Sequence, residues 1–186
     1  MTEQHNTVLV DGKGQAREGK GHDAFDEIPY DRLDRIRIVS VKLEKDNVSI
    51  VGDATSAYEP EVGLKGFTRR FTFTKADGFV ITDELAGDRP RVFTSMLHAD
   101  EKIEQAGRNQ FTIRAGAASL RAEILEPRSF NAKIEPNFLT AAGAPGSVDK
   151  GERQQRGERL AISTANPSSA TRFVMTLKIA PSITGQ

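Results

Sequence analysis

The sequence contains no cysteine and no tryptophan, and only three histidines among its 186 residues. The lack of cysteine excludes disulfide frameworks, thiolate metal sites and cysteine nucleophiles. A hydrolytic triad would have to draw on those few histidines, and no Gly-x-Ser-x-Gly segment is present to carry its serine. With no tryptophan and only two tyrosines, the core must be built mainly from Phe, Val, Ile and Leu.

The chain also lacks net charge, because 26 basic residues balance 26 acidic ones. Proteins that bind nucleic acid obtain much of their affinity by neutralising phosphates, and attachment to an anionic membrane surface needs an excess of basic residues. No apolar run approaches the length needed to span a bilayer, and the polar residues 1–4 carry no signal peptide. We therefore expect neither nucleic acid nor a membrane as a partner.

Residues 67–85 carry the clearest structural signal. Phe67, Phe71 and Phe73 alternate with Thr and Arg residues, which is typical of a strand with one buried face. Residues 75–78 end in Asp-Gly, which favours a tight hairpin turn, and Phe79 opens a second strand. Because an isolated hairpin cannot bury four phenylalanines, a larger antiparallel sheet must surround it. We expect Phe71 to face the core, so that Phe71→Ala destabilises the domain severely.

The remainder reads as many short strands separated by turn residues, with no convincing helical period. In the stretch before residue 45 the apolar phase changes between Ile38 and Val39, which predicts a β-bulge. This pattern indicates an all-β fold, an antiparallel β-sandwich of many short strands. We expect residues 1–186 to form a single domain. Within it, residues 127–159 are expected to be an irregular, partly mobile loop, with residues 149–159 the most mobile.

Three local motifs have ordinary structural explanations. Residues 14–21 nearly spell a phosphate-binding loop, but Gly21 replaces the required Ser or Thr and no helix is predicted to follow, so a flexible surface loop is expected. His98 ends an apolar strand, and we expect a histidine at the edge of the core that bonds to the backbone. Arg69 and Arg70 could bind a carboxylate, although one solvated face of a strand is the commoner explanation.

Four stretches in the first two thirds of the chain share a less common order of polar and apolar residues. Residues 5–15 read His-Asn-Thr-x-x-x-Asp-Gly-x-Gly-Gln, and residues 52–58 read Gly-Asp-x-x-x-Ala-Tyr. Residues 69–85 contain the hairpin pattern Arg-x-Phe-x-Phe-x-Lys-x-Asp-x-Phe-Val-Ile-x-Asp-Glu, and Leu97-His98 ends a strand. These stretches resemble, in the same order, segments of the heparinase II/III-like polysaccharide lyases. The resemblance covers most of residues 5–125.

The resemblance implies that this chain is the C-terminal β-sandwich domain of such a lyase. Its partners would then be an N-terminal α/α toroid domain and an acidic polysaccharide, whose uronic acids the family cleaves by β-elimination. The family takes its catalytic residues mainly from Asn, His and Tyr of the toroid. We therefore expect no catalytic residue in this chain and no activity of the chain alone, while its substrate-binding residues remain unassigned. The resemblance also implies a periplasmic or secreted location in a bacterium.

One residue role is carried by the same resemblance. His5 occupies the position of a family histidine that helps to hold a structural zinc ion, together with a second His and an Asp upstream. A single imidazole does not hold zinc, so we expect no cofactor in this chain, and zinc only in a full-length family enzyme. Tyr58 matches a recurrent family tyrosine without an assigned role.

Two other functions stay open on the sequence alone. The chain could be a non-catalytic carbohydrate-binding β-sandwich, although such modules usually offer aromatic platforms and this sequence has no tryptophan. It could also be a structural partner of a separately encoded toroid.

Overall fold

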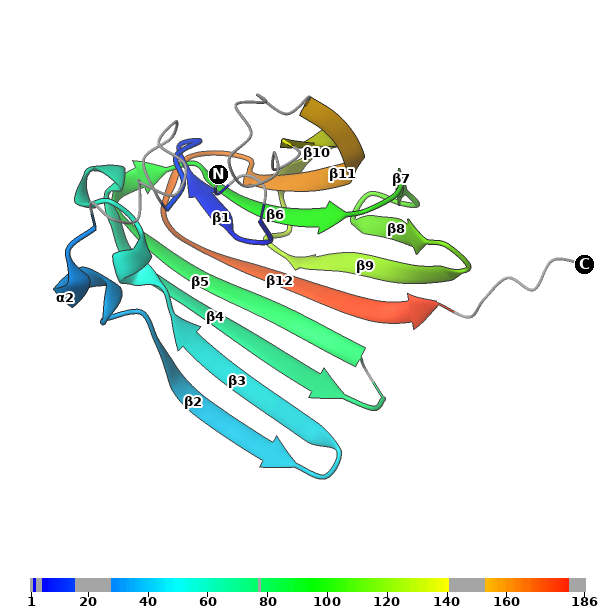
Figure 1. Cartoon of the computed structure of the whole chain (residues 1–186), viewed down its shortest axis with the longest axis horizontal. Helices are drawn as coiled ribbons and strands as arrows, with labels where there is room; N and C mark the ends of the chain where they lie inside the picture. Colours follow the sequence, from blue (N-terminus) through cyan, green and yellow to red (C-terminus); the bar gives the residue numbers. More distant parts are fainter. Residues whose placement is uncertain (1, 3–4, 16–27, 77, 141–152, 181–186) are drawn as a thin grey trace, which may run out of the picture.

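The computed structural model describes residues 2, 5–15, 28–76, 78–140 and 153–180. The chain forms two antiparallel sheets, which confirms the predicted all-β sandwich (Figure 1). The four-stranded sheet has the order β1 (Val8–Val10), β6 (Phe93–Ala99), β11 (Arg153–Thr164) and β10 (Phe130–Thr140). The eight-stranded sheet has the order β2 (Arg37–Glu44), β3 (Asn47–Asp53), β4 (Leu64–Thr74), β5 (Gly78–Arg91), β12 (Ser168–Ala180), β9 (Ala118–Glu126), β8 (Gln110–Ala115) and β7 (Ile103–Gln105).

Three short helical elements accompany the strands. These are α2 (Tyr30–Leu33) and the 3₁₀ turns η2 (Thr55–Ala57) and η3 (Pro60–Val62), which lie between or beside the strands of the eight-stranded sheet. Among the described residues, no helix is long and apolar enough to cross a membrane.

The central hairpin forms as the sequence predicts. β4 and β5 pair so that Phe67 lies opposite Leu85 and Phe73 opposite Phe79, and Gly78 closes the turn with a φ of 75°. The predicted bulge is also confirmed, because the register between β2 and β3 shifts between Ile38 and Ser40. An extra residue at that point reverses the phase of the apolar side chains, as the sequence pattern required.

The core lies where the two sheets face each other. Its largest fully buried side chains come from both sheets: Phe67 and Phe111 from the larger sheet, and Phe93, Leu160 and Ile162 from the smaller one. Each sheet therefore buries one apolar face against the other, which is the usual arrangement of a β-sandwich.

Burial decreases along the larger sheet, and the expectation for Phe71 was wrong. Phe67 is 2% exposed, whereas Phe71 is 42% exposed although it shares the same face of β4. The reason is the unequal width of the sheets: four strands cannot cover eight, and β2–β5 extend away from the smaller sheet (Figure 1). Phe79 is exposed for the same reason.

Residues 127–159 were expected to be irregular, and this is wrong for much of the stretch. β10 occupies Phe130–Thr140, and β11 begins at Arg153 and pairs antiparallel with it. From Arg153 onward β11 occupies the place of the expected loop, and residues 149–152 lie outside the described residues. The mobility of residues 149–159 stays a prediction. The phosphate-loop-like segment 14–21 also lies largely outside them, beyond Gln15.

Candidate functional site

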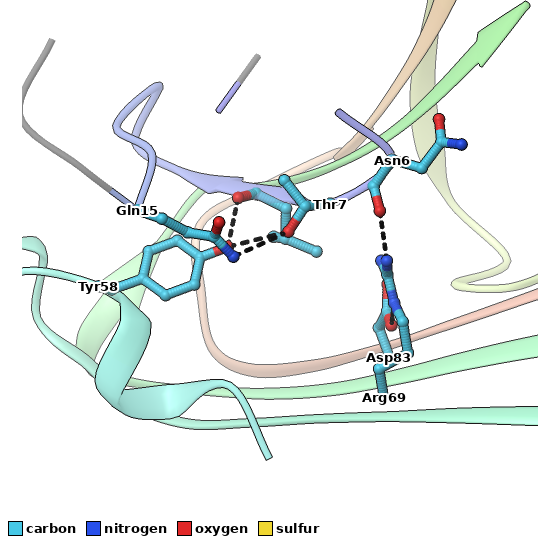
Figure 2. A network of polar contacts seen from close by, with 7 residues as sticks. Asn6, Thr7, Gln15, Tyr58, Arg69 and Asp83 are labelled. Carbon is cyan, nitrogen blue, oxygen red and sulfur yellow. Dashed lines mark hydrogen bonds and ion pairs between the residues drawn. The ribbon is translucent and has the colours of Figure 1, made fainter. Parts of the chain in front are cut away.

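Polar side chains from three of the four motif stretches meet where β1 lies against the larger sheet (Figure 2). Asn6 and Thr7 come from the segment that leads into β1, and Tyr58 follows the turn η2. Arg69 lies on β4 and Asp83 on β5. The sequence motifs are thus far apart along the chain but contribute to one polar network.

Tyr58 binds the outer edge of β1. Its hydroxyl donates to the carbonyl oxygen of Val8 at 2.6 Å and lies 3.4 Å from the hydroxyl of Thr7. Its ring meets Phe67 edge-on, with 6.0 Å between the ring centroids, and the side chain is 3% exposed. Gln15 completes the group by donating from Nε2 to Thr7 Oγ1 at 3.3 Å. Tyr58 therefore joins β1 to the larger sheet through both its ring and its hydroxyl.

The phenol of Tyr58 is held in its neutral form. Burial raises the pKa of Tyr58 above its ordinary value, although the hydrogen bond with Thr7 acts in the opposite direction. A phenol that donates to a backbone carbonyl and resists ionisation is a poor general base at neutral pH. The environment of Tyr58 indicates a structural role.

We expect Tyr58 to ionise only above the usual range of a tyrosine, about pH 10. Tyr30, the other tyrosine of the chain, is exposed, so a Tyr30→Phe protein leaves Tyr58 as the only source of phenolate absorbance. Because folding favours the neutral phenol, its contribution to stability is present at lower pH and is lost as pH rises through the folded-state pKa. An ultraviolet pH titration measures the ionisation, and urea unfolding at several pH values measures the stability. A titration midpoint at or below that of a free tyrosine peptide would contradict this prediction.

Arg69 and Asp83 form an ion pair across β4 and β5. Arg69 Nε lies 2.6 Å from Asp83 Oδ1 and Nη2 lies 2.7 Å from Oδ2, so the contact is bidentate. Asp83 is 1% exposed, and the remaining nitrogen, Arg69 Nη1, donates to the backbone carbonyl of Asn6. Burial by itself would lower the pKa of Arg69, but the Asp83 carboxylate raises it, so the guanidinium stays charged.

This pair corrects the expectation that Arg69 lies on a solvated strand face. Arg69 is in phase with the phenylalanines of β4 and points inward, whereas its neighbour Arg70 is exposed on the other face. The sequence contained a signal for this arrangement. A turn that pairs Thr74 with Gly78 fixes the register of the hairpin, and that register places Arg69 opposite Asp83.

Asn6 connects this ion pair to β6. Its side-chain Oδ1 accepts a hydrogen bond from the backbone N–H of His98 at 2.7 Å and lies 3.2 Å from His98 Nδ1. His98 is half-buried, as expected for a histidine at the edge of the core. Its ring contacts the side chain of Asn6, and a bond from the ring to the backbone stays a prediction. Asn6 thus contacts Arg69 through its backbone and His98 through its side chain.

A second tie secures the other end of β1. Asp11 and Gly12 form a tight turn with φ angles of 49° and 76°, after which Lys13 pairs back to Val10. The Asp11 carboxylate accepts from Arg91 Nη1 at 2.8 Å and from the backbone N–H of Val92 at 2.9 Å. The hydrogen bond from Arg91 lowers the pKa of Asp11, and the bond from Val92 acts in the same direction. No sequence motif pointed to Arg91.

His5, the expected zinc ligand, is exposed at the start of this region. Among the described residues, no group of three or more His, Cys, Asp or Glu side chains is placed to hold a metal ion. The described part of the chain therefore does not offer a zinc site around His5, and no chemical step is assigned to a metal. The role of His5 in holding zinc stays a prediction.

Two hollows flank Arg69 on the inner face of the larger sheet. A cavity of about 250 Å³ opens between the sheets, with a mainly apolar lining that includes Ile81 and Met175. On the other side, a groove of about 370 Å³ runs over Ile38 and Phe71 and is bounded by Thr7 and Gln15.

In this part of the chain Tyr58, Arg69 and Asp83 all have partners within the protein, so their geometry serves to hold β1 in place.

The fold and this network define a β-sandwich whose first strand is fixed to the larger sheet by buried polar side chains. The sequence profile of the family described as "Heparinase II/III-like, C-terminal" matches residues 1–175. The chain therefore belongs to the heparinase II/III-like C-terminal family, a family of polysaccharide lyases. A search of curated protein sequences finds no match.

Solved structures share the fold at low sequence identity. A heparinase III described as the BT4657 gene product matches with a TM-score of 0.69 and 16% identity, over 97% of this chain and 24% of its own. The heparan sulfate lyase HepC from Pedobacter heparinus matches with a TM-score of 0.69 and 12% identity, over 99% of this chain and 25% of its own. This chain thus spans about a quarter of the length of these structures.

Proposed function

We propose that this chain is the C-terminal β-sandwich domain of a lyase that cleaves uronic-acid polysaccharides by β-elimination, and that it does not perform the chemistry alone. Its partner in this proposal is an N-terminal α/α toroid domain that carries the catalytic residues. The observation that carries the proposal is the state of the motif residues: Tyr58 is buried and neutral, and Asp83 neutralises Arg69. The lengths of the structural neighbours also support it, because about three quarters of each lies outside the matching part.

The reaction sets requirements that these residues do not meet. β-Elimination needs a group that neutralises the sugar carboxylate, a base for the C5 proton and an acid for the leaving oxygen. Tyr58 donates its proton to Val8 and is shielded from solvent, so it cannot reach a polysaccharide without unfolding β1. The guanidinium of Arg69 already binds a carboxylate of its own chain. The motif residues therefore shape and stabilise the domain.

We expect the isolated chain to show no lyase activity. Heparin, heparan sulfate and alginate are incubated with the chain, and the absorbance of unsaturated uronate products is followed, with a complete heparinase III as the positive control. The expected trace stays at the level of buffer. Product absorbance that is abolished by Tyr58→Phe or by His5→Ala would show that this chain is catalytic by itself and would overturn the proposal.

A further inference from the structure

The inner face of β2–β5 is apolar beyond the reach of the smaller sheet. Five of its side chains, which we call the open face, are 42–72% exposed. Strand registers place them in adjacent rows of one surface, since Val41 lies opposite Ile50, Ile50 opposite Phe71, and Phe71 opposite Ile81. The open face consists of Ile38, Val41, Leu43, Phe71 and Phe79.

The two faces of these four strands differ sharply in polarity. The outer positions of β4 carry Thr68, Arg70, Thr72 and Thr74, which suit contact with water. The inner positions are apolar apart from the pair Arg69–Asp83, whose charges neutralise each other. A solvated surface has no need of this pattern, because contiguous apolar patches larger than a few hundred Å² are uncommon on monomers and mark interaction sites.

The chemistry of the open face selects protein over polysaccharide as its occupant. An acidic sugar polymer needs cations and hydrogen-bond donors, and the open face offers aliphatic and aromatic carbon. The geometry of the open face restricts the shape of this occupant further. The groove over Ile38 and Phe71 has the larger sheet as its floor and Thr7 and Gln15 of the β1 region as one wall. An occupant must therefore be a flat apolar layer that fits beside the four-stranded sheet.

The edge of β1 that faces away from β6 is not free to pair with a further strand, which would extend the four-stranded sheet over the open face. Val10 exchanges both backbone hydrogen bonds with Lys13, and the carbonyl of Val8 accepts the hydroxyl of Tyr58. These contacts occupy the side of β1 that faces away from β6. The layer that covers the open face must then pack onto it face to face, as one sheet packs on another about 10 Å away.

We propose that the occupant is a second copy of this chain, so that two open faces pack against each other about a twofold axis. The β2–β5 part of each copy is itself a sheet with one apolar and one polar face, which is the chemistry that the other copy requires. No net charge opposes the contact, because the inner charges are already paired. Five side chains exposed to this extent present several hundred Å² per copy, on the order of the ~800 Å² per partner in a standard interface.

The test is the oligomeric state in solution, measured by sedimentation equilibrium over a range of protein concentrations. We expect the unmodified chain to be a dimer at micromolar concentration and Leu43→Glu to weaken the dimer at least tenfold. Leu43 is 72% exposed, so the substitution should not affect folding. Lys42→Glu is the matched control, because the adjacent residue is exposed on the opposite face of β2 and receives the same side chain.

A second variant tests whether the effect of Leu43→Glu is limited to the edge strand β2. Phe79→Glu changes the open face on β5, and it too should weaken the dimer while circular dichroism shows an intact β fold. A monomer at all concentrations would overturn the proposal, whether or not the open face then binds another domain. A dimer that survives both Leu43→Glu and Phe79→Glu would also overturn it, because the contact would lie on a different surface.

Discussion

Phe67→Ala is expected to lower the free energy of unfolding by about 3–5 kcal/mol, a large part of the 5–15 kcal/mol typical of a domain. Phe67 is buried between the sheets, and its ring contacts Tyr58, so truncation removes apolar burial and leaves a cavity. The aromatic support that orients the Tyr58 hydroxyl toward Val8 is lost at the same time. Urea unfolding followed by circular dichroism measures the change.

Phe79→Ala is the control, since it removes the same side chain from the same hairpin at a position that is 45% exposed. Its cost should be clearly smaller, because water already reaches the Phe79 ring where it packs on Phe73. Both measurements belong at protein concentrations where the chain is monomeric. A larger loss for Phe79→Ala than for Phe67→Ala would mean that the core does not lie where the structure places it.

The strands and their turns could be predicted because their causes are local. Alternation of apolar residues in β4, the Asp-Gly turn before Phe79 and the phase change at Val39 each follow from the geometry of a few neighbouring residues. The strand, the hairpin that pairs Thr74 with Gly78, and the register shift after Ile38 are all present in the structure. In β10 the local signal misled, because Pro, Gly and Ala residues around it suggested irregular backbone, whereas pairing with β11 makes the segment a strand. Tertiary pairing overrode a weak local preference.

Burial within a strand could not be predicted in the same way. Phe67 and Phe71 have the same residue type, the same strand and the same face, yet one is buried and the other exposed. The difference depends on how far the four-stranded sheet extends over the eight-stranded one, which is a property of the topology. Nothing in the alternation of β4 reports the width of the opposite sheet.

The polar network was predictable in part. The pairing of Arg69 with Asp83 follows from the hairpin register and could have been obtained by counting back from Gly78. The contacts of Tyr58 with Val8 and of Asn6 with His98 join segments 50 and 92 residues apart. Contacts at such separations require knowledge of the fold, so the motif residues could be recognised in the sequence while their roles could not.

Arg69→Met is expected to destabilise the domain by about 3–5 kcal/mol, because it leaves the Asp83 carboxylate buried without its partner. Asp83 is 1% exposed, so water cannot replace the guanidinium without opening the structure. The double variant Arg69→Met, Asp83→Leu should recover much of the loss, since it removes both charges and keeps apolar volume. Urea unfolding of the three proteins measures this, and a double variant less stable than Arg69→Met would contradict the interpretation.

The role of the motif residues as a tie between β1 and the larger sheet is tested most directly by amide hydrogen exchange of residues 7–11 in the Arg69→Met protein. Arg69 donates to the carbonyl of Asn6, two residues before β1, so the loss of Arg69 should release β1 first. We expect exchange in residues 7–11 to accelerate more than exchange in β8 and β9, and Arg70→Met, which alters the exposed neighbour, to change neither. Equal acceleration in β1, β8 and β9, or unchanged protection of β1, would contradict a tie at this site.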